Sequence, residues 1–105
     1  MPAELTEAEF SKHVNTKFQV RTDSETPIDL ELDEVKGYSS RYKEHDGMER
    51  FSIFFNGPKQ PFLEQTTYTL EHEQMGEFEI FLVPIARRDD GFRYEAVFNY
   101  FKSAV

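Results

Sequence analysis

The chain opens with a helical spacing of hydrophobic residues and then changes to an alternating one. Residues 5–14, LTEAEFSKHV, carry a helix-start signal: Thr6 and Glu9 match a capping box, and Leu5 and Phe10 match a hydrophobic staple. Two to three turns of helix are unstable alone in water. We therefore expect this helix to dock on another part of the protein.

Alternation of apolar and polar residues begins at Lys17, just after Asn15, where we expect the helix to end. Side chains on a strand point alternately to its two faces, so this pattern is typical of β-strands with one face in water. Val35 departs from the alternation, which predicts that its strand ends or bulges near Glu34. The predicted strands lie near residues 17–21, 28–35, 49–55, 66–72, 77–83 and 92–101.

The stretch from Met75 to Phe101 is the densest aromatic segment of the chain and predicts two strands joined by a charged turn. Asp90 and Gly91 are the strongest hairpin pair in the sequence. Pro84 has no backbone N–H, so it should lie at a sheet edge, a bulge or a strand end. The face that should join the core carries Phe78, Ile80, Leu82, Tyr94, Phe98 and Tyr100.

These elements predict a single domain, residues 1–105, of mainly β (α+β) class. We expect a short N-terminal helix followed by about six antiparallel strands that form a small barrel or sandwich. The 11 Phe and 5 Tyr supply enough apolar surface for a folded core, unlike the composition of a disordered chain.

The opposite faces of the strands are unusually apolar. Two interpretations are open: the helix covers these residues with its own apolar stripe, or they remain exposed as a surface for a partner or a second copy. We favour the helix, because it also needs a surface on which to dock. The residues concerned, which form the candidate interaction patch, are Phe54, Phe81, Val83, Val97 and Phe101.

The formal net charge of −8 argues against nucleic acid and anionic membranes as partners, since both are polyanions. The chain has no cysteine, which excludes disulfides and thiolate metal sites. It shows no signal peptide and no apolar run of membrane-spanning length. We therefore expect a cytoplasmic location.

No residue pattern for catalysis, metal binding or cofactor binding rises above background. His72 lies between Glu71 and Glu73, and we expect it to be a solvated histidine at a strand end rather than a metal ligand. The acidic series Asp29, Glu31, Asp33 and Glu34 predicts a solvated strand face, not a cation site. We expect a protein that is not an enzyme and has no metal and no cofactor.

Residues 37–48, GYSSRYKEHDGM, are the most polar and least periodic part of the middle of the chain, and predict a loop. A catalytic alternative would use this loop and a strand end, with Tyr42, His45 and His72 close together in a cleft. Catalysis requires such convergence, and the sequence does not establish it.

Several motifs resemble a bacterial family of small domains, domain of unknown function 6916. The resemblance covers most of the chain, including residues 5–18, and leaves residues 36–48 least matched. It implies a fold rather than an activity, and a loose association with phage-tail or tail-fibre proteins. The motifs are FSIFFNGP at 51–58, QTTYTLEH at 65–72, MGEF at 75–78, FLVPI at 81–85 and YEAVFN at 94–99.

We therefore expect a non-enzymatic binding or assembly module, accessory to a phage-tail-like structure, that captures a protein partner or self-associates through the candidate interaction patch. The alternative is a small-ligand carrier with an aromatic-lined barrel interior.

Overall fold

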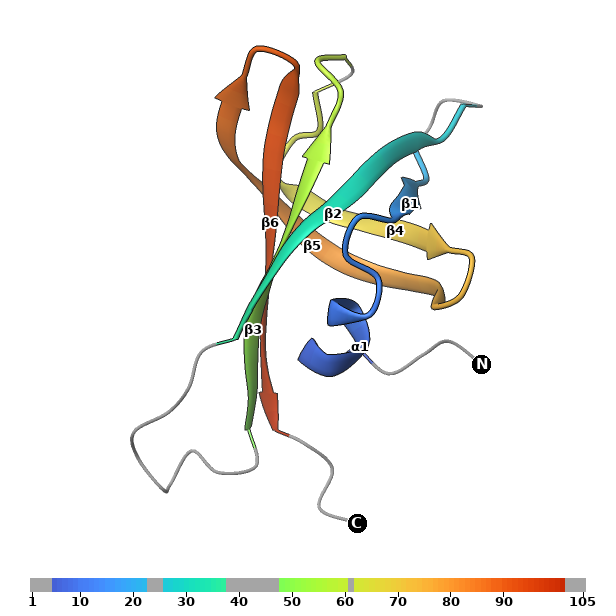
Figure 1. Cartoon of the computed structure of the whole chain (residues 1–105). Helices are drawn as coiled ribbons and strands as arrows, with labels where there is room; N and C mark the ends of the chain where they lie inside the picture. The colour runs from blue at the N-terminus through green and yellow to red at the C-terminus, as the bar shows by residue number, and fades with distance from the viewer. Residues whose placement is uncertain (1–4, 23–25, 38–47, 61, 102–105) are drawn as a thin grey trace.

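A computed structural model describes residues 5–22, 26–37, 48–60 and 62–101 (Figure 1). No helix in this described part of the chain is long and apolar enough to span a membrane. Its elements, in chain order, are α1 (Glu7–Ser11), β1 (Lys17–Val20), β2 (Ile28–Gly37), β3 (Met48–Gly57), β4 (Thr66–His72), β5 (Gly76–Arg88) and β6 (Gly91–Phe101).

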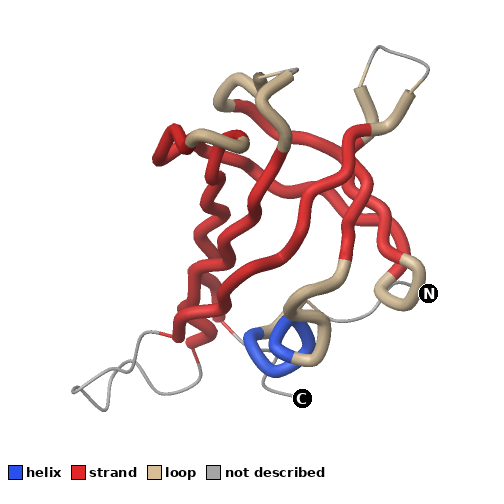
Figure 2. The backbone as a smooth tube through the Cα atoms, turned by 45° about the horizontal axis from the view of Figure 1, so that its top comes forward, coloured by secondary structure: helices blue, strands red, loops and turns tan. Residues whose placement is uncertain are grey.

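All neighbouring strands pair antiparallel in one sheet, with the order β1-β2-β3-β6-β5-β4. Strand β1 pairs with β2 on one side and, through Gln19 and Val20, with β4 on the other, so the order closes on itself. Figure 2 shows the strands winding around a common interior. The predicted mainly β class, with one short helix before six antiparallel strands in the described residues, is confirmed.

Strand β5 divides its pairing between two neighbours. Its first half pairs with β4 up to Leu82, and from Val83 onward it pairs with β6. A register shift between Pro84 and Ala86 leaves Ile85 as a bulge residue. The sequence prediction for Pro84 is confirmed, because a residue without an N–H is tolerated where the ladder is interrupted.

Strand β2 contains the second irregularity. Its register against β3 shifts between Leu32 and Glu34, where the sequence predicted a bulge or an end. The strand continues to Gly37, so the bulge is the correct alternative. Asp33 is the extra residue, and it therefore lies beside Glu34 on the outer face of the sheet.

The inner face of the sheet forms one hydrophobic core. Phe78, Ile80, Leu82 and Tyr94 are buried, as predicted, whereas Phe98 is half-buried and the side chain of Tyr100 lies outside the described residues. The buried hydrophobic residues are Phe10, Phe18, Val20, Ile28, Leu30, Leu32, Phe51, Ile53, Phe55, Leu63, Leu70, Met75, Phe78, Ile80, Leu82, Tyr94 and Ala96.

Helix α1 is held at its start by Thr6, whose hydroxyl accepts a hydrogen bond from the backbone N–H of Glu9 at 3.1 Å. This is the predicted cap, although Glu9 directs its own carboxylate to His13 and Lys12. After the helix, Asn15 adopts a φ of 72°. Asparagine tolerates this left-handed conformation, which lets the chain turn from the helix toward β1. The helix itself ends at Ser11, with Lys12 as its C-cap, so the predicted end at Asn15 is wrong.

The preferred prediction that α1 covers the outer patch is wrong. Its one fully buried side chain, Phe10, instead packs among the aromatic rings of the interior. The reason is geometric: the closed sheet leaves an open end lined with apolar rings, and a single large side chain fills it. The Phe10 ring lies 5.5 to 6.3 Å, between centroids, from the rings of Phe18, Phe51, Phe78 and Phe98.

Tyr94 ties the segment before β4 to the core. Its ring is fully buried, and its hydroxyl accepts a hydrogen bond from the backbone N–H of Leu63 at 2.9 Å. Burial raises the pKa of Tyr94, partly offset by the hydrogen bond from Leu63. The phenol therefore remains neutral at physiological pH.

Replacing Tyr94 with phenylalanine is expected to lower the free energy of unfolding by about 1–2 kcal/mol, because the buried N–H of Leu63 would lose its acceptor. Urea denaturation of both proteins measures the difference. The matched control is Tyr68→Phe, since the Tyr68 hydroxyl donates to the carbonyl of Glu64 at an exposed position where water can replace it. Equal losses in the two variants would contradict the prediction.

Candidate functional site

The structure brings three of the five patch residues together around Glu95. Strand β6 lies between β3 and β5, so Glu95 pairs with Phe54 on one side and with Val83 on the other. Val97 is the next residue of β6 on the same face. Phe81 lies further along β5, opposite Thr67 of β4. Phe101 ends β6, but its side chain is outside the described residues.

The patch is exposed at its margins and partly covered at its centre. Val97 retains 64% of its surface and Phe81 49%, whereas Phe54 and Val83 are half-buried. Ile85, at 44%, is a further exposed apolar residue that the sequence analysis missed. The signal was present, because Ile85 follows Phe81 and Val83 in the alternation and so belongs to the same face.

Arg93 covers the centre of the patch. Its guanidinium carbon lies 4.7 Å from the ring centroid of Phe54, a cation–π arrangement. Nη1 donates to Asp33, and Nη2 donates to Glu34 at 2.9 Å. The β2 bulge places these two consecutive carboxylates on one face, so a single guanidinium can bind both. Arg93 is consequently only 8% exposed, although it projects from the outer face.

The alternating pattern predicted that Asp33 and Glu34 would be solvated, and it indicated no role for Arg93. The two carboxylates do remain partly exposed, with side-chain exposures of 39% and 53%, but Arg93 binds both. The partners are about 60 residues apart in the chain. No local spacing could therefore indicate that they meet.

Replacing Arg93 with methionine is expected to lower the free energy of unfolding by about 1–2 kcal/mol. The methionine retains some packing on Phe54 but removes the cation–π contact and both charge-assisted hydrogen bonds. The carboxylates remain accessible to water, which limits the loss. Chemical denaturation measures it, with Arg21→Met as the control, because the Arg21 ion pairs are on an exposed side chain. A larger loss in the control would contradict the prediction.

A second polar cluster joins the end of α1 to the end of β4. His72 is buried, and its ring lies 4.5 Å from the ring of His13 and 4.3 Å from that of Phe18, between centroids. The predicted solvated histidine at a strand end is therefore wrong. The reason is that the segment after α1 folds over the end of β4 and covers the imidazole.

The hydrogen bonds of His72 define its tautomer. Its Nδ1 accepts from the backbone N–H groups of Gln74 and Met75, at 3.1 and 3.2 Å. Nε2 lies 2.9 Å from Oγ1 of Thr16, whose hydroxyl donates to the carbonyl of His13 at 2.6 Å. Nε2 must then carry the proton and Nδ1 must be bare. The imidazole is held neutral by donors that face its only free nitrogen.

Burial lowers the pKa of His72, and the neighbouring His13 lowers it further, against the smaller opposing effect of Glu73. His13 is also buried and has Nε2 3.3 Å from a carboxylate oxygen of Glu9. Tyr42 and His45, which the catalytic alternative would bring to His72, lie outside the described residues. The contacts of His72 are those of a structural residue that fastens α1 and the following turn to β4.

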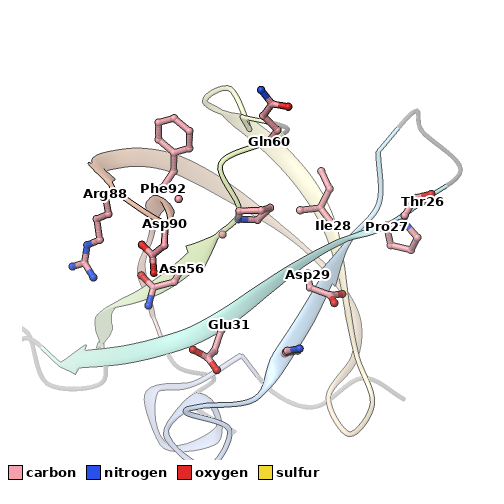
Figure 3. Close-up of a pocket in the computed structure, with 14 residues that line it drawn as sticks. Thr26, Pro27, Ile28, Asp29, Glu31, Asn56, Gln60, Arg88, Asp90 and Phe92 are labelled. Carbon is pink, nitrogen blue, oxygen red and sulfur yellow. The ribbon is translucent and has the colours of Figure 1, made fainter.

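An open groove lies beside the β5–β6 turn (Figure 3). Acidic and basic side chains line it, including Asp29 and Glu31 from β2, Arg88 from the end of β5 and Asp90 from the turn. Oδ1 of Asn56, also in its lining, is buried and has no hydrogen-bond partner among the described atoms. Within those residues no group of three His, Asp or Glu side chains could hold a metal ion.

Gly91 forms the tight contact that shapes this end of the sheet. A Cβ at Gly91 would overlap the backbone carbonyl of Gly57, so only glycine allows the β5–β6 turn to approach the end of β3 so closely. The groove beside it is therefore a consequence of backbone packing.

Comparison with known proteins gives one positive result. No curated protein and no solved structure gives a significant match to this chain. One family model, described as a domain of unknown function, matches residues 5–98, which include the helix, all of β1 to β5 and most of β6. The chain therefore belongs to the DUF6916 family.

Proposed function

We propose that this protein is a non-enzymatic binding or assembly module that captures a protein partner through its outer face. The observation that carries this proposal is the exposure of Val97 and Phe81 on a face that α1 leaves uncovered. The one large side chain of α1 that could have covered them, Phe10, is committed to the interior. Exposed apolar residues beside charged ones are typical of protein interaction sites.

The charges around the patch indicate the chemistry of the partner. Glu95 lies within it, and Glu34 and Asp33 border it beyond Phe54. Arg93 neutralises part of this charge but is itself largely covered. With a net charge of −8 on the chain, the complementary surface is an apolar centre with a basic rim.

An accessory role in a phage-tail-like structure is the most specific form of this proposal. Its support is the association that the family resemblance implies, together with a compact β domain that has an exposed apolar face. Assembly components of this kind work by docking, which requires no catalytic cluster.

Affinity capture from the native host, followed by mass spectrometry, tests the proposal. We expect a protein partner to be retained by the wild type and lost with Phe81→Glu and with Val97→Glu. Gln19→Glu is the matched control, because Gln19 is exposed on the same outer face of the sheet but lies in β1, away from the patch. Retention by all three variants, or no partner with the wild type, would contradict the proposal.

The alternative function is carriage of a small ligand in the aromatic-lined barrel interior. It has weaker support, because the interior rings pack against one another at centroid distances between 4.6 and 6.3 Å. Titration with an environment-sensitive apolar dye at neutral pH distinguishes the two functions. Saturable binding by the native protein that Phe81→Glu and Val97→Glu leave unchanged would favour the carrier.

A further inference from the structure

The C-terminal half of β6 has one edge without a strand partner in the described part of the chain. Strand β6 pairs with β3 over its whole length, from Phe92 to Phe101. It pairs with β5 only as far as Glu95, because β5 then turns to β4. Figure 1 shows this lower half of β6 beside β3, with β5 running away from it. Within the described residues no strand pairs with the backbone groups that point to this edge, and such an edge can accept another strand.

Two other open edges carry the features by which proteins prevent such pairing. The edge of β5 beyond Val83 has Pro84, the bulge at Ile85 and two arginines. The end of β2 beyond Asp33 is charged, and α1 lies against it, with the Glu7 carboxylate over Gly37. Proline, bulges, charges and covering helices all discourage edge pairing.

The open edge of β6 has no charge, proline or bulge, and α1 reaches this half of the strand through the contact of Phe10 with Phe98. Residues 96–101 read AVFNYF, without charge, proline or glycine, and residues of this kind favour strand pairing. Val97 and Asn99, the outward residues on this edge, are both exposed. In a chain with a net charge of −8, most surfaces would repel a second copy, but this neutral segment would not.

We infer that two copies of this chain associate through antiparallel pairing of their β6 edges about a two-fold axis at Asn99. A two-fold axis perpendicular to the joined sheet places the same segment opposite itself, so each copy supplies the complement that the other needs. This inference goes beyond the proposed function, because the second copy pairs with the β6 edge whereas the captured partner binds the outer face.

The register follows from the length of the free edge. A pairing centred on Asn99 uses residues 97–101 and leaves Ala96 as a spacer before Glu95, where β5 occupies the edge. Residues directly opposite each other share a face, so Asn99 meets Asn99 of the second copy, and Val97 meets position 101. No carboxylate lies opposite another in this register.

Disulfide trapping tests the register, because the wild-type chain has no cysteine to complicate the result. Mild oxidation of Asn99→Cys is expected to give a covalent dimer, since directly opposite residues lie about 5 Å apart. Val97→Cys is the matched control on the same strand and face. In the proposed register, the cysteines at position 97 of the two copies would lie four residues apart, about 14 Å along the strand. This variant should therefore run as a monomer on a non-reducing gel.

Sedimentation equilibrium of the wild type supplies the second measurement. A concentration-dependent dimer that is weakened at least tenfold by Asn99→Lys supports the inference, because that variant places two like charges opposite each other. A wild-type monomer at every concentration, or equal trapping of both cysteine variants, would overturn it. Phe81→Glu separates this outcome from the proposed function, because Phe81 is in the patch but not on the β6 edge: it should abolish partner capture and leave the dimer intact.

Discussion

Replacing Phe10 with alanine is expected to lower the free energy of unfolding by about 3–5 kcal/mol, the cost of removing a buried aromatic ring and leaving a cavity. Phe10 is fully buried and contacts four aromatic rings, two of them on β3 and β6 and two on β1 and β5. It is the main apolar link between α1 and the closed sheet. Domains of this size have only about 5–15 kcal/mol of stability in total, so the variant should be close to unfolding.

Chemical denaturation monitored by tyrosine fluorescence and circular dichroism measures this loss. Phe81→Ala is the matched control: it removes the same atoms from a ring that is 49% exposed on the outer face. Surface substitutions usually change stability by about 0.5 kcal/mol or less. If Phe81→Ala destabilised the protein as much as Phe10→Ala, the helix would have to cover the outer face after all.

Lowering the pH from 7.5 to 5.5 is expected to destabilise the protein through His72. The folded state lowers the pKa of this histidine, mainly by burial, whereas the unfolded value is about 6.5. Below that value the unfolded chain binds a proton that the folded chain does not. The free energy of unfolding should therefore fall by up to about 1.4 kcal/mol for each pH unit, until the pH reaches the folded pKa.

Protonation of His72 would disrupt the contacts that hold the segment after α1 against the end of β4. A proton on Nδ1 would face the backbone N–H groups of Gln74 and Met75, which donate to that nitrogen in the neutral ring. The positive charge on the His72 ring would also lie close to the ring of His13, 4.5 Å away between centroids. The joint between α1 and β4 should therefore open first, and amide exchange of residues 10–16 should accelerate before that of β3.

His72→Gln is the test of this assignment, because glutamine can accept a hydrogen bond but does not titrate. The variant should be less stable than the wild type at pH 7.5 and should lose most of the pH dependence down to 5.5. Denaturant midpoints at five or six pH values measure both effects. A slope that is equal in the two proteins would assign the dependence to other groups.

The alternation of apolar and polar residues was enough to predict the strands, but it did not predict the contacts around the candidate interaction patch. The alternation placed β4 at residues 66–72, and the departure at Val35 located the β2 bulge. The same patterns identified Phe81 and Val97 as outward residues. They gave no sign of the role of Arg93, because that role depends on partners in β2 about 60 residues away.

Patterns along the chain were enough to predict the number and faces of the strands, the start of the helix and the family, since each depends on neighbours within a few residues or on local motifs. The surface that the helix occupies could not be predicted from these patterns, because it depends on closure of the sheet, which leaves an open end that a single Phe10 ring can fill. That choice leaves Val97 and Phe81 exposed. It also buries His72 beneath the turn that follows α1, a contact between residues 56 positions apart.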